Sequence, residues 1–349
     1  MATAAQSRRI YFLPFFPLES ELRVGDTLFW PFYQLKDTLI PDEGLRRDLE
    51  RIFSCYVDHR GQILETITIA SLHGPDLSPL STDEEQYLDA AVKAVAFASI
   101  VKNVYRFQYR NSENFQVYTQ ELIPNQEEIT LTYHFRRAAY GGYVHRQGPF
   151  PLTQTRFTQP QSVLLSGTRE LDGRLLAGCG RVIEARAANQ NAERITRSLE
   201  WFYFSHFDLR DIPDTAAAVM MSTAFETLFD LPENGKTERF IRSVEELLVT
   251  RAAGFLDAVA SARNRRMNWR NTPREYNNAG WWAHNFYNLR SSIVHGSRWQ
   301  FLHNGRSHLE IADLVFIECL KRKLQENGYY SYSAEDEEFR KEIYQRINL

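Results

Sequence analysis

The segment that most clearly defines the fold class lies near the C-terminus, at residues 281–296, and reads WWAHNFYNLRSSIVHG. Four of its apolar side chains are spaced four, three and four residues apart: Trp282, Phe286, Leu289 and Ile293. At about 100° per residue, these four lie along one side of an α-helix. Gly296 is a natural end for this helix, because glycine readily adopts the left-handed conformation at a helix C-terminus. We therefore predict a helix that packs one face against a core.

The sequence around this segment has the same helical character from about Asn191 onward. Helices are predicted at residues 195–206, from an Asp214 cap to Phe229, at 236–251, at 255–266, from the capping sequence Thr272-Pro273-Arg274-Glu275 to Gly296, and from Ser307 to about Gly328. Because the connections between them are short, the C-terminal part of the chain is predicted to be an all-α bundle.

The first 190 residues show a mixed α/β pattern. Ser81 and Glu84 form a capping box at the start of a helix that extends to about Asn103. Segments rich in β-branched and aromatic residues predict strands at 62–70, 115–121, 129–135 and 163–166. The glycine-rich segment 167–180 is predicted to be a loop.

These patterns predict the α+β class, with a mixed α/β domain at 1–190, an all-α helical domain at 191–330 and a peripheral acidic tail at 331–349. The length of 349 residues fits two domains. Hydrophobic residues make up 43% of the chain and charged residues 24%, which excludes a disordered or fibrous protein.

Cysteine content and hydropathy indicate the compartment. Cys55, Cys179 and Cys319 are too few and too far apart for a disulfide framework or a C-x2-C zinc site, as is typical in the reducing cytosol. The apolar run 10–18 is interrupted by two prolines and is too short to span a membrane. We therefore expect a soluble, cytoplasmic protein that does not associate with membranes.

Positive charge is concentrated in one window of a chain whose net charge is −3. Residues 251–306 contain nine arginines and two acidic residues, a local net charge of +7, together with four of the six tryptophans. Arginine and aromatic side chains together suit single-stranded nucleic acid, because guanidinium groups contact phosphates and flat rings stack on bases. The candidate RNA-binding residues are Arg263, Arg265, Arg266 and Arg270. The alternative is that the arginines are solvated and the tryptophans belong to the core.

The same window contains a pair suited to phosphodiester cleavage, Arg290 and His295. Histidine can take a proton from a ribose 2′-hydroxyl or give one to the leaving 5′-oxygen, and arginine can stabilise charge on the phosphate oxygens. This chemistry requires the 2′-hydroxyl and so selects RNA. Spacing alone does not identify the pair, because chance predicts about 2.6 similar Arg–His pairs. The second pair in this chain, Arg298 and His303, lies beyond Gly296.

Helical geometry places Arg290 and His295 off the apolar stripe, at about 80° and 220° from it. His284, Tyr287, Ser291 and Val294 are expected on the arc between them, which would form one non-core face. The pair is about 140° apart on the helix, too wide for one helix to hold a single phosphate. A second copy of the same face across a two-fold axis would close this gap.

Residues 195–324 resemble the HEPN superfamily of ribonucleases, in particular its ApeA-like branch in bacterial antiphage proteins. The resemblance rests on LRSSIVHG at 289–296 and on AFETL at 224–228. It implies a HEPN-like nuclease domain in which Arg290 and His295 are catalytic, two protomers form one site, and no metal or cofactor is needed. It also implies that Glu226 orients Arg290. Ser291 departs from the Asn, Asp or His that many members have after the arginine.

The expected function is a metal-independent endoribonuclease that cleaves single-stranded RNA or tRNA loops, as a toxin-like antiphage effector. His284, Tyr287, Asn288 and Ser291 are expected to support the site. By analogy, residues 1–190 would act as a sensor or regulatory domain that responds to a phage-derived or protein activator. The alternatives are a non-catalytic RNA-binding or dimerisation module and an effector subunit that is active only within a larger complex.

Overall fold

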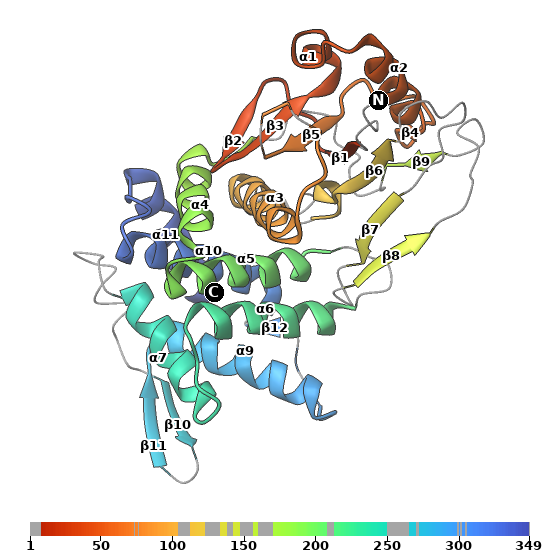
Figure 1. Cartoon of the computed structure of the whole chain (residues 1–349). Coiled ribbons are helices and arrows are strands. Elements are labelled where there is room, and N and C mark those ends of the chain that lie inside the picture. Colours follow the sequence, from red (N-terminus) through yellow and green to blue (C-terminus); the bar gives the residue numbers. More distant parts are fainter. Residues whose placement is uncertain are drawn as a thin grey trace. The chain divides into compact units, whose positions relative to one another are not determined.

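A computed structural model of the chain is shown in Figure 1. It describes residues 8–72, 74–75, 77–103, 112–122, 133–137, 142–146, 156–159, 170–207, 213–249, 265–269, 272–298, 300, 302–303 and 306–348. The chain divides into two compact units, Met1–Glu184 and Ala185–Leu349, whereas the sequence suggested a boundary near residue 190. Among the described residues, none of the helices is both long enough and apolar enough to cross a membrane.

The first unit contains a seven-stranded antiparallel sheet with the order β2-β3-β5-β1-β6-β7-β8. Its strands are β1 (Arg8–Leu13), β2 (Leu22–Val24), β3 (Thr27–Pro31), β5 (Thr68–Ser71), β6 (Tyr118–Leu122), β7 (Tyr133–Arg137) and β8 (Gly142–Arg146). A separate parallel pair joins β4 (Tyr56–Val57) to β9 (Phe157–Thr158). The predicted strands at 62–70, 115–121 and 129–135 are therefore present but shifted, and 163–166 lies outside the described residues.

Helices cover both faces of this sheet. They are α1 (Phe32–Leu39), α2 (Glu43–Phe53), α3 (Thr82–Asn103) and α4 (Gly173–Ala185), with a short 3-10 turn, η2 (Glu113–Phe115). Side chains alternate along β1 as a strand requires. Ile10 and Phe12 belong to the core that includes residues of α2, whereas Arg9 and Tyr11 both bond to Glu85 of α3. The mixed α/β character expected of the N-terminal part, and the α+β class, are confirmed.

Two predictions about local structure in this unit had opposite outcomes. The capping box is confirmed, because the backbone N–H of Ser81 donates to Glu84 Oε2 at 2.7 Å. The loop predicted at 167–180 is wrong from Gly173 onward, where α4 begins. The helix contains Gly180 because a Cβ there would lie 2.9 Å from the backbone nitrogen of Gly25. This glycine thus allows a close approach of backbones and does not mark a loop.

The second unit is mainly helical. Its helices are α5 (Gln190–Ser205), α6 (Asp214–Leu228), α7 (Lys236–Val249), α9 (Asn278–Val294), α10 (His308–Glu326) and α11 (Ala334–Asn348). Two small hairpins interrupt them, β10 (Arg265–Trp269) with β11 (Thr272–Tyr276), and β12 (Leu302–His303) with β13 (Arg306–Ser307). The expectation of a purely α-helical domain is therefore wrong in this respect.

The helix predicted from Thr272 to Gly296 is present as α9, but its predicted first residues form the strand β11 instead. Thr272 pairs with Trp269 and Pro273 with Asn268 across the β10–β11 hairpin. Proline is tolerated in such a ribbon because an edge position does not need its backbone N–H. A further helix was predicted at 255–266. Its last two residues, 265 and 266, belong to β10, and residues 255–264 lie outside the described part of the chain. Likewise, Asp214 does not cap α6; the N-cap residue is Pro213, and Asp214 lies in the first helical turn.

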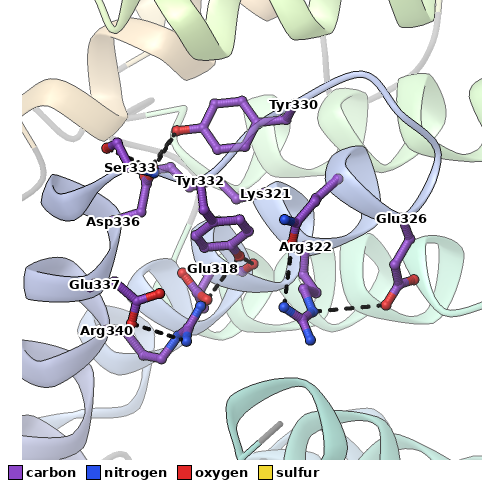
Figure 2. Close-up of polar contacts among 11 residues, drawn as sticks. Glu318, Lys321, Arg322, Glu326, Tyr330, Tyr332, Ser333, Asp336, Glu337 and Arg340 are labelled. Atoms are coloured by element: carbon purple, nitrogen blue, oxygen red, sulfur yellow. Dashed lines mark hydrogen bonds and ion pairs between the residues drawn. The ribbon is translucent and has the colours of Figure 1, made fainter. Parts of the chain in front are cut away.

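The expectation of a peripheral acidic tail is also wrong. Helix α11 packs against α10, and four of its residues, spaced four, three and four apart, are almost fully buried: Asp336, Arg340, Ile343 and Ile347. Two of these four are charged, so hydrophobic periodicity does not reveal the buried face. Both charged side chains have buried partners on α10 (Figure 2). Arg340 donates to Glu318 at 2.9 Å, and Lys321 donates to Asp336 at 2.8 Å.

Candidate functional site

Helix α9 packs on the core along the predicted stripe. Trp282 and Phe286 are fully buried and Leu289 is 3% exposed, whereas Ile293 near the helix end is partly buried. Phe225 of α6 makes edge contacts with the Trp282 and Phe286 rings at 6.4 and 6.0 Å between centroids. The predicted docking of this helix is therefore confirmed, and it fixes which side of α9 faces away from the core.

The N-terminus of α9 is held by α7. Asn277 caps the helix, because its side-chain oxygen accepts the N–H of Gly280 at 2.8 Å. Glu245 of α7 accepts the backbone N–H of Asn277 at 3.0 Å, where a carboxylate also interacts favourably with the helix dipole. A Cβ on Gly280 would lie 2.3 Å from Glu245 Oε1, so this position accommodates glycine alone without movement.

The C-terminus of α9 presents His295. The residue is the C-cap, its side chain is exposed, and its backbone N–H donates to the carbonyl of Ser291 at 3.0 Å. Gly296 follows with a φ of +68°, and Ser297 N–H closes onto Ser292 O at 2.8 Å. This is the glycine-terminated C-cap expected from the sequence. His295 is thus held by its backbone and is exposed at the end of the helix.

Glu226 is the centre of the polar contacts around Arg290. It lies on α6, and its side chain is 11% exposed. Its Oε2 accepts from Lys236 Nζ of α7 at 2.8 Å, and its Oε1 accepts from the Tyr287 hydroxyl of α9 at 3.0 Å. Arg290 Nη2 of α9 lies 3.7 Å from the same Oε1. One carboxylate therefore joins three helices, and Arg290 is the most distant of its three partners.

Arg290 contacts Tyr287 and Glu226 and is partly exposed. Its guanidinium carbon lies 5.8 Å from the centre of the Tyr287 ring, and a quarter of its side chain is exposed. Its Nε is buried and makes no hydrogen bond within the described part of the chain. Because Nε is closed to solvent, an incoming anion would have to bind the exposed part of the Arg290 side chain.

Two residues expected on the open face with Arg290 are buried instead. His284 is 2% exposed and Tyr287 is 6% exposed. The helical-wheel expectation fails because α9 is contacted by α6, α7, α11 and β11, so its buried arc is wider than a single stripe. Three other residues were expected on this face or as supporting residues of the site. Asn288 and Ser291 are partly buried, and Val294 is 50% exposed.

Burial changes the ionisation of both residues. Burial lowers the pKa of His284 to about 4, so the imidazole is neutral near neutral pH. The His284 ring stacks with those of Tyr276 and Trp281, and its Nε2 lies 2.7 Å from Asn288 Nδ2. Burial, and then the charge of Glu226, raise the pKa of Tyr287 well above its usual range. Tyr287 is therefore a protonated donor to Glu226, and His284 is a structural residue.

The second Arg–His pair does not form a comparable site. Arg298 is exposed beyond the end of α9, whereas His303 in β12 is 4% exposed. His303 lies 5.6 Å from the ring of His308, which is also buried. Burial, with a further contribution from His303, lowers the pKa of His308 to about 4. Both histidines are buried, and His308 is neutral near neutral pH.

The candidate RNA-binding arginines are only partly placed. Arg265 and Arg266 lie in β10, where they pair with Tyr276 and Glu275 of β11, the strand that leads directly into α9. Arg263 and Arg270 lie outside the described residues. Of the tryptophans in the same window, Trp282 is in the core and Trp281 is partly buried.

Lys236 is a site residue that sequence reasoning missed. It is the first residue of α7, directly after Gly235 with a φ of +74°, and its Nζ bonds to Glu226. A lysine at a helix N-terminus is electrostatically unfavourable, because the positive end of the helix dipole lies there. That mismatch was the available signal that this side chain has a specific acidic partner.

Two further questions concern possible metal ligands and similarity to known proteins. The residues described here include no group of three or more His, Cys, Asp or Glu side chains arranged to hold a metal ion. Comparisons with protein-family models, with curated proteins and with solved structures found no match to this chain.

Proposed function

We propose that the chain is a metal-independent endoribonuclease of the HEPN type, with Arg290 and His295 as its catalytic residues. The observation that carries the proposal is the contact between Glu226 and Arg290, from separate helices, at the two positions where the sequence resembles that superfamily. The arginine is partly exposed and the histidine five residues later is exposed on the same helix. This chemistry needs an accessible guanidinium and an accessible imidazole, and helix α9 carries one of each.

The proposed reaction uses the ribose 2′-hydroxyl as the nucleophile. His295 accepts the 2′-hydroxyl proton while the 2′-oxygen attacks the adjacent phosphorus. The bond from phosphorus to the 5′-oxygen then breaks, and that oxygen takes a proton from the protonated imidazole of His295, which returns to its neutral form. Arg290 stabilises the negative charge on the non-bridging oxygens in the transition state. The products are a 2′,3′-cyclic phosphate and a 5′-hydroxyl, and the substrate is single-stranded RNA or a tRNA loop.

The proposed active form is a homodimer. Arg290 and His295 are about 140° apart on their helix, so one copy does not present both groups to one phosphate. Val294, next to His295, is 50% exposed and offers apolar surface that a second copy would cover. We expect a dimer in sedimentation-velocity measurements, and a monomer that nevertheless cleaves RNA would contradict this part of the proposal.

The biological role follows from the same resemblance. An unrestrained ribonuclease would damage its host, so we assign the nuclease to the second unit and a sensor or regulatory role to the first. A phage-derived or protein activator would then release the activity in antiphage defence. The alternative favoured by Ser291, which departs from the usual motif, is a module that binds RNA or dimerises without cleaving, or that acts only inside a larger complex.

The decisive test compares purified wild type with Arg290→Ala and His295→Ala on labelled single-stranded RNA and tRNA. We expect His295→Ala to lower the cleavage rate about 100-fold or more, as loss of a general acid–base group does. Arg290→Ala should lower it about 100-fold or more too, because it removes a group that stabilises transition-state charge. Arg242→Ala is the control, because Arg242 is exposed and its ion pair with Glu238 lies within α7. End-group analysis should detect the cyclic phosphate.

Three outcomes separate the proposal from its alternatives. Equal cleavage by all variants, or complete loss of wild-type cleavage with a chelator, contradicts the proposed mechanism. RNA retention without cleavage, with affinity that falls steeply as salt rises, supports the non-catalytic module. Cleavage that starts only after a neighbouring gene product is added supports the subunit of a larger complex.

A further inference from the structure

We infer that Lys236 is a positioning residue: by occupying the Glu226 carboxylate it prevents a close Glu226–Arg290 ion pair and leaves the Arg290 guanidinium available for an RNA phosphate. The inference rests on the proposed function and deepens it by explaining how Arg290 is both held and kept reactive. It concerns three residues from three helices, α6, α7 and α9.

The first step is the geometry of the carboxylate. An arginine and a carboxylate normally form two parallel hydrogen bonds of about 2.7–2.9 Å, one to each oxygen. Here Oε2 of Glu226 already accepts from Lys236 at 2.8 Å, and Oε1 accepts from Tyr287 at 3.0 Å. Arg290 Nη2 is left at 3.7 Å from Oε1, beyond hydrogen-bonding distance. The lysine thus occupies the oxygen that a two-bond pair with Arg290 would require.

The second step is the state of Arg290. Its Nε is buried without an acceptor within the described residues, and its guanidinium is held near the Tyr287 ring and the Glu226 charge. These contacts restrict where the group lies but use few of its five donors. A phosphodiester would bind the donors in the exposed part of the side chain, whereas the buried Nε lies out of its reach. A loosely paired arginine therefore binds phosphate better than one fully neutralised by a carboxylate.

The third step is what happens without the lysine. If Lys236 is removed, Oε2 of Glu226 loses its only partner seen among the described residues, and Arg290 lies close enough to replace it. The resulting two-bond pair would sequester the guanidinium. The substitution is therefore harmful only while the acidic side chain is present, and neutralising Glu226 at the same time should relieve the defect.

The experiment measures this dependence with Lys236→Met, Glu226→Gln and the double variant. Cleavage of a fluorescein-labelled single-stranded RNA gives kcat and KM. Affinity for the same RNA is measured by fluorescence anisotropy at several salt concentrations in a His295→Ala background, where no cleavage interferes. Lys323→Met is the matched control, because Lys323 is similarly exposed and makes one ion pair, to Glu326 at 2.9 Å. Circular dichroism confirms that each variant is folded.

We expect Lys236→Met to weaken RNA affinity and cleavage about 10-fold, while Lys323→Met has no effect. The double variant should return to within about 3-fold of Glu226→Gln, because the defect depends on the Glu226 charge. The salt dependence of binding should be unchanged by Lys236→Met, since a positioning residue does not contact phosphate.

Two results overturn the inference. The first is that Lys236→Met behaves as wild type while Arg290→Ala loses RNA binding and cleavage. The second is a double variant as weak as Lys236→Met, with the salt slope of log affinity reduced by about 0.7, which shows that Lys236 itself contacts a phosphate. If Arg290→Ala also binds and cleaves as wild type, the proposed function fails together with the inference, and the two failures are thus distinguished.

Discussion

At the residue scale, the mostly buried carboxylate of Glu226 organises the candidate site. It is 11% exposed and is surrounded by a lysine, a tyrosine hydroxyl and an arginine. The carboxylate needs these partners because removing an ion from water is costly unless charge and hydrogen bonds replace its hydration. The three partners come from α7 and α9, so this one side chain sets the local geometry of three helices.

His284 gives a pH prediction at the same scale. Its pKa in the folded chain is about 4, below the ordinary 6.5, because burial disfavours the charged ring. As pH falls from 6.5 to 4, the unfolded chain therefore takes up a proton that the folded chain does not, and the folded state loses stability. The expected loss is at most about 1.4 kcal/mol per pH unit.

Urea denaturation across that pH range, for wild type and His284→Gln, measures this effect. The variant should show a weaker loss of stability on acidification, and His308 should account for part of the remaining loss, because its pKa is also lowered to about 4. Identical pH dependence in variant and wild type would mean that His284 is not buried as a neutral group.

At the scale of elements, α11 is attached to α10 through buried charges. Burial raises the pKa of Glu318, against the attraction of Arg340. At Asp336 burial acts in the same direction, but Lys321, the Ser333 N–H and Tyr330 together outweigh it and lower the pKa of that carboxyl. Tyr332 and Tyr330 donate further hydrogen bonds to these two acids (Figure 2). Such a network depends on every member being satisfied.

Arg340→Met tests this network. The substitution leaves Glu318 buried without its cation, so we expect a loss of about 3–5 kcal/mol in the free energy of unfolding. Lys341→Met is the control in the adjacent position, because Lys341 and its partner Glu338 are exposed, and a change of less than about 0.5 kcal/mol is expected. Urea midpoints measure both, and equal effects of the two substitutions would contradict the assigned role of the buried pair.

At the scale of the whole molecule, each of the two units has a core of its own. In the second unit, Met221, Phe225, Trp282, Phe286 and Phe316 are each fully buried, and they come from three different helices. A unit with its own core is expected to fold without the rest of the chain.

Expression of residues 185–349 alone tests that expectation. The fragment should be helical by circular dichroism and should unfold in one cooperative urea transition, with an m-value of about 1–3 kcal/mol/M. A gradual transition, or a loss of near-ultraviolet signal at zero urea, would show that the second unit depends on residues 1–184.

The sequence by itself determined the features that depend on neighbours along the chain. The stripe of α9, its end at Gly296, the capping box of α3 and the exposed position of His295 follow from helical periodicity and from the conformational freedom of glycine. The same local information was ambiguous at Thr272-Pro273, which suits both a helix start and an edge strand, and only pairing with β10 decided between them.

Only the tertiary structure decided which polar side chains are buried and what they contact. Lys236 reaches Glu226, His284 is enclosed between aromatic rings, and charged residues form the buried face of α11. The physical reason is that burying a charge is favourable only beside a suitable partner, and that partner lies far away in the chain. Hydrophobic periodicity therefore locates the core, whereas the polar contacts that define the candidate site arise from the packing of helices.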